Sequence, residues 1–89
     1  MNKVEKLNLI IKMYQDGQYD TDTFADVFSY TYGKESNDNC DRAVLDKYKN
    51  LFMITSRYSP YEDEISLYPN VYCSKQDILD ALDLLKSKL

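Results

Sequence analysis

Few side chains in this chain could carry out catalytic chemistry. Its 89 residues include no histidine, which is the usual general base and the commonest metal ligand in proteins. Cys40 and Cys73 are potential nucleophiles, but no histidine is present to activate either thiol. Two cysteines without histidine or a third cysteine also do not complete a typical zinc site. We therefore expect a non-enzymatic protein with no metal or cofactor, in which both cysteines are reduced and partly buried; a reactive or bridged pair is the alternative.

Three consecutive carboxylates, Glu62, Asp63 and Glu64, are the remaining candidate for chemistry. Paired carboxylates serve as acid and base when burial separates their pKa values, which adjacent acids in a small exposed segment seldom achieve. The twelve-residue calcium loop with its central glycine is absent, and so is a glycine-rich phosphate loop. These acids fit either a binding surface or ordinary solvated charge better than an active site.

The acidic residues are unevenly distributed. The chain has 15 acidic and 11 basic residues, a formal net charge of −4. Residues 15–46 contain eight acids and two bases, and residues 58–83 contain six acids and one base. This argues against direct binding of nucleic acid or an anionic membrane, because phosphate contacts need clustered lysine and arginine. It favours a basic protein partner, since a field of one sign attracts the opposite charge and speeds association. Acids placed at helix starts and in turns, with no partner, are the simpler explanation for any single residue.

Tyrosine adds weight to a protein partner. The chain has nine tyrosines and no tryptophan. Tyr58, Tyr61, Tyr68 and Tyr72 lie in or beside the segment that carries the three consecutive acids. Tyrosine offers a large, rigid contact area with a polar tip and is enriched at binding hot spots. An interface and a simple cover over the end of a small core both agree with this pattern.

Apolar periodicity predicts four helices that would position these side chains. The first and last are expected over residues 3–15 and 74–89, where Gly17 ends the first and a Ser74–Asp77 capping box starts the last. Thr21 or Asp22 is expected to cap the second helix, and Gly33 is expected to end it. The third begins at Asp38 or Asn39 and ends near residues 57–59, before Pro60.

Residues 59–73 show no helical period, and Pro60 and Pro69 bracket their centre. We expect an irregular loop here, with residues 65–68 as a possible extended stretch. Its length exceeds that of usual helix connections, and such loops are often functional. The predicted fold is all-α: one domain over residues 1–89, folded as a small antiparallel four-helix bundle with a long irregular loop between helices three and four.

The first residues suggest no export signal. Charges recur every few positions up to Lys12, and the longest apolar run among them is residues 9–11. That run is far shorter than a signal-peptide core or a membrane span. We expect a cytoplasmic protein that is monomeric when free and has no membrane partner.

Residues 51–60 resemble a known family. The order Leu51-Phe52-Met53, then Arg57-Tyr58 and Pro60, followed by acids, is similar to the self-protective colicin-like immunity family, which includes the colicin D immunity protein. The Met1-Asn2-Lys3 opening, the aromatic-rich segment near Phe24, the closing Lys-x-x-Leu and the chain length are also similar, over most of the chain at low identity. In this chain Ser56 and Tyr61 stand where the family member has acids.

The resemblance implies a four-helix antiparallel bundle that neutralises a cognate bacterial toxin. The toxin would be a ribonuclease acting on transfer RNA, of the colicin type or of a contact-dependent growth inhibition system. Family members place a negative surface in the basic cleft that would hold RNA, so that carboxylates replace phosphates. The matching segment puts Arg57, Tyr58 and residues 62–64 at the candidate contact edge.

We therefore predict a partner-binding surface that combines carboxylates and tyrosines. Its residues are Asp38, Asp41, Tyr58, Tyr61, Glu62, Asp63, Glu64 and Tyr68. Residues 41–46, the acids of the second helix and the loop acids would converge if the loop folds over the end of the bundle. Arg57 could pair with a toxin carboxylate, or it could cap the third helix or hold the acidic loop. The alternative function is a small acidic regulatory or scaffold protein that self-associates or binds a partner helix through an apolar face.

Overall fold

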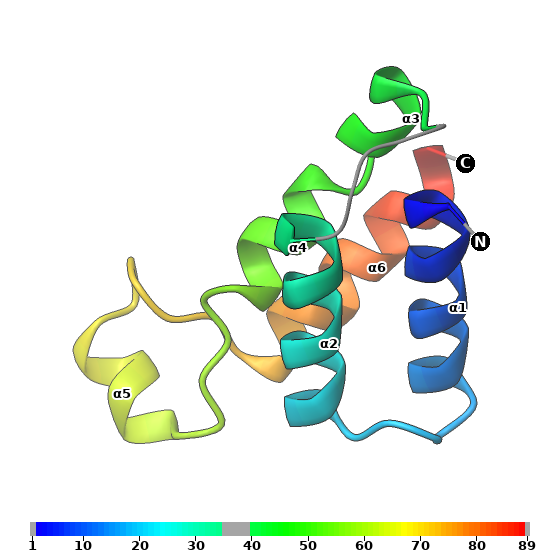
Figure 1. The fold of residues 1–89 in the computed structure, drawn as a ribbon. Helices are drawn as coiled ribbons and strands as arrows, with labels where there is room; N and C mark the ends of the chain where they lie inside the picture. Colours follow the sequence, from blue (N-terminus) through cyan, green and yellow to red (C-terminus); the bar gives the residue numbers. More distant parts are fainter. Residues whose placement is uncertain (1, 35–39, 89) are drawn as a thin grey trace.

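The structure, a computed structural model, describes residues 2–34 and 40–88 (Figure 1). Within these ranges the predicted all-α class is confirmed, because every regular element is a helix and none is a strand. The helices are α1 (Lys3–Gln15), α2 (Thr21–Lys34), α3 (Arg42–Asp46), α4 (Lys49–Thr55), α5 (Glu62–Leu67) and α6 (Lys75–Lys88).

Local signals set the ends of the longer helices. Asn2 and Glu5 form a capping box at the start of α1, where the Glu5 amide donates to Asn2 Oδ1 at 2.9 Å. Gly17 follows α1 with φ 82°, a left-handed conformation that glycine adopts at little cost. The predicted Ser74–Asp77 capping box starts α6, with the Ser74 amide 2.8 Å from Asp77 Oδ2 and the Asp77 amide 3.2 Å from Ser74 Oγ.

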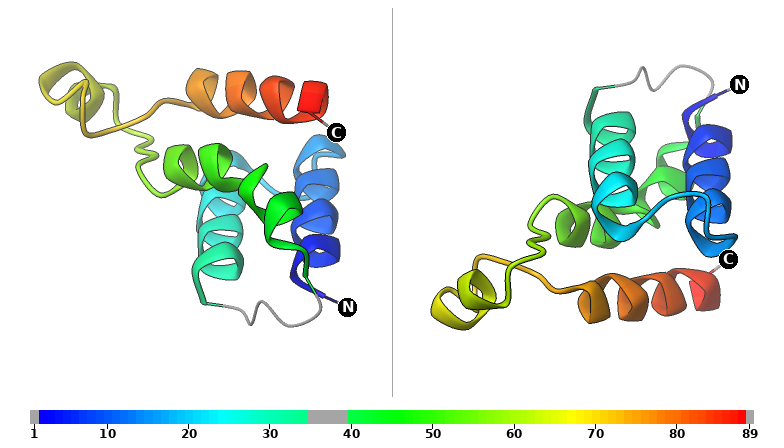
Figure 2. Two further views of the ribbon diagram at one scale, coloured as in Figure 1. Left: turned by 90° about the horizontal axis from the view of Figure 1, so that it is seen from above. Right: turned by 90° about the horizontal axis from the view of Figure 1, so that it is seen from below.

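The helices form two antiparallel pairs that cross each other. α1 and α2 lie side by side and run in opposite directions, and so do α4 and α6 (Figure 2). The second pair lies across the first, with α2 packed on α4. At the contact between α2 and α4, Ser29 Oγ and Thr55 Oγ1 share a hydrogen bond of 2.8 Å. This bond satisfies two hydroxyls that would otherwise be costly to desolvate.

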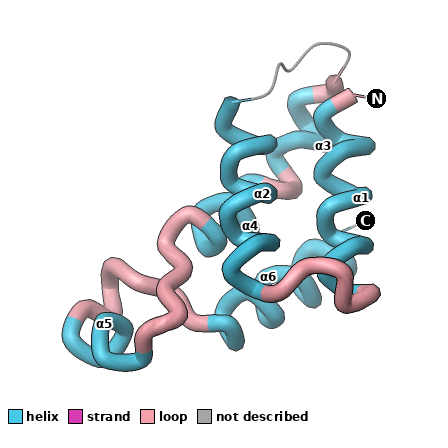
Figure 3. Tube along the Cα trace, turned by 60° about the horizontal axis from the view of Figure 1, so that its bottom comes forward, coloured by secondary structure: helices cyan, strands magenta, loops and turns pink. Residues whose placement is uncertain are grey.

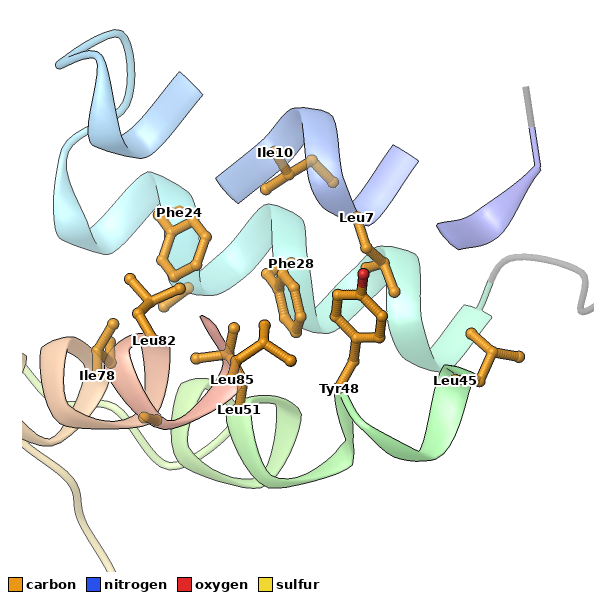
Figure 4. Packing of buried hydrophobic residues seen from close by; sticks show 12 residues of the cluster. Leu7, Ile10, Phe24, Phe28, Leu45, Tyr48, Leu51, Ile78, Leu82 and Leu85 are labelled. Atoms are coloured by element: carbon orange, nitrogen blue, oxygen red, sulfur yellow. The ribbon is translucent and has the colours of Figure 1, made fainter. Parts of the chain in front are cut away.

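The core fills the space between the two pairs (Figure 4). Phe24 and Phe28 on α2 are fully buried, and the Tyr14 ring of α1 stacks on Phe24 with centroids 4.4 Å apart. The buried hydrophobic residues are Leu7, Ile10, Phe24, Ala25, Phe28, Leu45, Tyr48, Leu51, Ile78, Ala81, Leu82 and Leu85. They come from every described helix except α5, together with the turn between α3 and α4.

The third predicted helix is divided into α3 and α4. The amides of Lys47 and Tyr48 donate to the carbonyls of Val44 and Leu45, three residues back instead of four, so the backbone tightens into a turn. Tyr48 is 1% exposed at this turn, and its hydroxyl donates to Asn8 Oδ1 on α1. Its contact with α1 fixes the turn against the core, which the apolar spacing alone does not reveal. The predicted start at residues 38–39 lies outside the described residues.

The expectation of an irregular loop over residues 59–73 is wrong at its centre, where α5 forms. Helix α5 buries none of its residues. Apolar periodicity records which face of a helix is buried, so a helix without a buried face shows no period. The three acids in the first turn of α5 favour a helix there, because the N-terminal end of a helix attracts negative charge.

Candidate protein-binding surface

The chain between α4 and α6 leaves the body of the protein and returns to the same point. At this point Tyr58 and Cys73 form an isolated parallel bridge. The Ser59 amide donates to the Cys73 carbonyl at 3.0 Å, and the Cys73 amide donates to the Arg57 carbonyl at 2.8 Å. We call residues 58–73 the α5 excursion and this bridge its neck. Because its two ends are paired, the excursion is a closed surface loop.

Backbone hydrogen bonds hold the excursion in shape. Ser59 is 5% exposed at the neck, and its hydroxyl oxygen accepts from the Tyr61 amide at 3.1 Å, just before α5. After α5, the Tyr68 amide donates to the Glu64 carbonyl at 2.9 Å, and the amides of Val71 and Tyr72 donate to the Tyr68 carbonyl at 2.9 and 3.1 Å. Local bonds, not burial in the core, therefore define this segment.

Large side chains on the excursion are unusually exposed. Tyr61 is 63% exposed, Leu67 72%, Tyr68 57% and Val71 53%. Helix α5 stands away from the other helices in every view, carried on two loop segments (Figures 1 and 3). Exposed apolar and aromatic side chains concentrated in one short segment favour a binding site there.

The three acids of α5 differ in their surroundings. Glu62 and Asp63 are exposed in the first turn of the helix. Glu64 is half-buried, and its negative charge and a hydrogen bond from Tyr72 raise the pKa of the Tyr72 phenol. The Tyr72 ring in turn meets Tyr68 edge-on, with centroids 6.3 Å apart. Glu62 and Asp63 are therefore more open to a partner than Glu64.

Tyr58 connects the neck to α2. Its hydroxyl donates to Asp22 Oδ1 at 2.9 Å, across 36 residues of sequence. Partial burial and this bond to the Asp22 carboxylate raise the pKa of Tyr58 to about 12. The phenol therefore stays protonated at neutral pH and keeps donating. This geometry gives Tyr58 a positioning contact within the protein.

The predicted site residues are only partly brought together. Residues 61–64 and Tyr68 lie on the excursion, and Tyr58 lies at its neck. Asp41 lies at the start of α3, at the opposite end of the molecule from α5, where its Oδ1 accepts from the Ala43 amide at 2.8 Å (Figure 1). Asp38 lies outside the described residues.

Residues 41–46 and residues 62–64 would converge only if the loop folded over the end of the bundle, and this condition is not met. The excursion points outward instead of folding over the end of the helices, because α5 has no apolar face that packs on them. One acid of α2 does approach the neck, since Asp22 accepts from Tyr58.

Sequence reasoning missed Leu67 and Val71, which are among the most exposed large apolar side chains described. The sequence carries no signal of this exposure, because an apolar residue in a segment without a helical period can be either buried or exposed. Arg57 is exposed directly after α4, where a positive charge suits a helix C-terminus. Burial and the negative charge of Asp77 raise the pKa of the Cys73 thiol, and the positive charge of Arg57 partly opposes this rise.

Other kinds of site are not evident in the described part of the chain. Residues 2–34 and 40–88 contain no cluster of three or more side chains able to hold a metal ion. Cys40 and Cys73 are both free thiols, so the alternative of a bridged pair is not formed. None of the described helices is long and apolar enough to cross a membrane.

Comparison of the chain with protein-family models, with curated proteins and with solved structures finds no match. The likeness of residues 51–60 to the colicin-like immunity family therefore stays a hypothesis.

Proposed function

We propose that this protein is an immunity protein that binds and neutralises a cognate bacterial toxin. The toxin is a tRNA-cleaving ribonuclease of the colicin or contact-dependent growth inhibition type. In this proposal the helices form an antiparallel bundle that serves as a scaffold, and the α5 excursion enters the basic cleft that would otherwise hold RNA. The observation that carries the proposal is the excursion itself, which presents exposed carboxylates and tyrosines away from the core.

The charge of the excursion supports a cationic partner. Residues 58–73 contain three acids and no base, so their field is uniformly negative. Carboxylates occupying a phosphate-binding cleft would form charge-assisted hydrogen bonds with its arginines and lysines. A field of one sign also speeds the encounter with a partner of the opposite sign, by about tenfold to a thousandfold at low salt.

The exposed tyrosines support a protein partner. Tyr61 and Tyr68 present broad faces that can stack on arginine guanidinium groups, and their hydroxyls can accept or donate hydrogen bonds. Because the hydrogen bonds on both sides of α5 already order its backbone, little conformational entropy is lost on binding. Inhibition results because RNA cannot enter a cleft that already holds the excursion. The inhibitor itself catalyses nothing.

The experiment uses the gene next to this one. We expect the upstream neighbour to encode a protein whose C-terminal region is a basic domain of about 100 residues. That purified domain should cleave transfer RNA, and an equimolar amount of this protein should abolish the cleavage. Unrestrained cleavage in the presence of excess protein would overturn the proposed function, and so would a neighbour without such a domain.

One observation favours the second candidate, a scaffold protein that self-associates or binds a helix. An open groove of about 580 Å³ lies between α1 and α6, lined in part by Tyr14, Leu79 and Leu82. Size-exclusion chromatography at several concentrations separates the two functions. A tight homodimer that Leu79→Ser disrupts would favour the scaffold, whereas a monomer that inhibits the toxin favours immunity.

A further inference from the structure

The far end of α5 carries an apolar corner that the acidic surface does not explain. It consists of Leu67, at the last position of the helix, with Tyr68 and Val71 in the turn that follows. The Val71 amide donates to the Tyr68 carbonyl at 2.9 Å, so this turn folds back on itself. We call these three residues the apolar corner.

The corner is held in place although it is exposed. The Tyr68 amide donates to the Glu64 carbonyl at 2.9 Å, which ties the corner to α5. The Tyr68 ring meets the Tyr72 ring edge-on, with centroids 6.3 Å apart. The backbone of the corner is therefore ordered before binding, so less conformational entropy is lost when its side chains enter a pocket.

The two ends of α5 thus differ in chemistry. Glu62 and Asp63 occupy the first turn, and Leu67 occupies the last position. A helix of six residues is about 9 Å long, so both ends fit within one contact area. The absence of any base in residues 58–73 makes the acidic end complementary to a cationic surface, and a nucleic acid or an anionic membrane would be repelled.

We infer that the partner is a protein whose cationic cleft adjoins an apolar recess, and that Leu67, with Tyr68 and Val71 beside it, fills this recess. The partner's identity as a toxin nuclease rests on the proposed function. The acids act during the encounter, because charge acts over a distance. The apolar corner acts after docking, because apolar burial requires contact. The acids therefore control the association rate constant, and the apolar corner controls the dissociation rate constant.

The test measures the binding of the purified neighbour-encoded nuclease domain by surface plasmon resonance. We expect Leu67→Ser to raise the dissociation rate at least about tenfold, since full burial of a leucine accounts for that much affinity or more. Its association rate, and the salt dependence of that rate, should stay unchanged. The matched control is Leu9→Ser on α1, because Leu9 is 45% exposed and lies away from α5. It should change neither rate.

The outcomes separate this inference from the proposed function. If the wild-type protein binds and inhibits the nuclease but Leu67→Ser dissociates at the wild-type rate, the recess is refuted and the immunity function stands. If the wild-type protein does not bind the nuclease, both fail. Sedimentation of the free protein tests a further occupant: a concentration-dependent dimer that Leu67→Ser abolishes would assign the corner to a second copy and overturn the inference.

Discussion

Tyr58 shows how one side chain can connect a binding surface to the body of a protein. It lies at the neck, half-buried, and its hydroxyl reaches Asp22 on α2. Glu64 is half-buried within the excursion, and its negative charge raises the pKa of the Tyr72 phenol. Asp22 is thus engaged within the protein, and Glu64 is less open to a partner than Glu62 and Asp63. The residues left for binding are therefore fewer than the acidic composition suggests.

The Tyr58 bond predicts a pH dependence at high pH. The folded-state pKa of Tyr58 is raised from 10.0 to about 12, so folding favours the protonated phenol. The resulting stability is fully present below pH 10 and is lost as the pH rises toward about 12. We expect Tyr58→Phe to remove part of the decline in urea stability across this interval.

Phenolate absorbance provides a direct check on that assignment. The titration of Tyr58→Phe should lack a group that ionises near pH 12 in the wild-type protein. Tyr30→Phe is the control, because Tyr30 is 64% exposed, and it should leave the alkaline end of the titration in place. A Tyr58→Phe titration that matches the wild type at the alkaline end would show that the hydrogen bond to Asp22 is absent in solution.

The helices divide into those that build the core and one that does not. All the described helices except α5 contribute buried residues, and α5 depends on hydrogen bonds and on the neck (Figure 4). A segment with few buried contacts opens locally at low cost, whereas core helices open only with the whole fold. Amide hydrogen exchange is therefore expected to be faster in α5 than in α2.

Two leucines provide a matched pair that tests this division. Leu51 on α4 is 1% exposed, and Leu67 on α5 is 72% exposed. Leu51→Ala should lower the free energy of unfolding by about 2–5 kcal/mol, because it leaves a cavity in the core. Leu67→Ala should change it by less than about 0.5 kcal/mol, as is usual for a surface position. Similar losses for both variants, measured by urea denaturation, would mean that the excursion packs on the core.

This division also explains how far the fold could be predicted from the sequence. The spans of α1 and α6 follow from apolar spacing and cap residues, because burial imposes a period on the sequence. Apolar spacing also predicts the body of α2, but Asp20 instead of Thr21 or Asp22 caps it, and the helix continues through Gly33. The break at Tyr48 depends on a contact with Asn8, 40 residues away, which local pattern does not encode. Helix α5 has no buried face, so its residues show no helical period and the sequence predicts a loop there.

The candidate site was predictable to a similar extent. The cluster of acids and tyrosines at residues 61–68 was visible as composition, without knowledge of the fold. Its separation from Asp41 depends on the direction in which the excursion leaves the body, and the neck sets that direction through the pairing of Tyr58 with Cys73. Leu67 and Val71 were missed because an apolar residue in a non-periodic segment gives no indication of its exposure.

The molecule as a whole is elongated, with principal extents of 41 × 26 × 25 Å. Helices α3 and α5 lie at its two ends, so the acids of residues 41–46 and those of residues 62–64 face separate regions of solvent. The negative charge can therefore attract a basic partner from a wide range of directions, while the contact itself forms at the excursion. In this account the charge of the whole protein provides the long-range attraction, and the α5 excursion at one end provides the specific contacts.

The central claim is that the carboxylates of α5 dock in a cationic cleft, and the association rate with the neighbour-encoded nuclease domain tests it most directly. The rate is compared at about 0.01 M and about 0.15 M ionic strength, where the screening length falls from about 30 Å to about 8 Å. The test variant combines Glu62→Gln and Asp63→Asn, the two exposed acids of α5, and the control removes two charges elsewhere, through Asp16→Asn and Asp83→Asn.

We predict that the α5 variant associates about tenfold more slowly than the wild type at the lower ionic strength and depends less on salt. The control variant should lose much less of the rate. Equal association rates for the wild type and the α5 variant at the lower ionic strength would contradict the account, because the acids of the excursion would then take no part in docking.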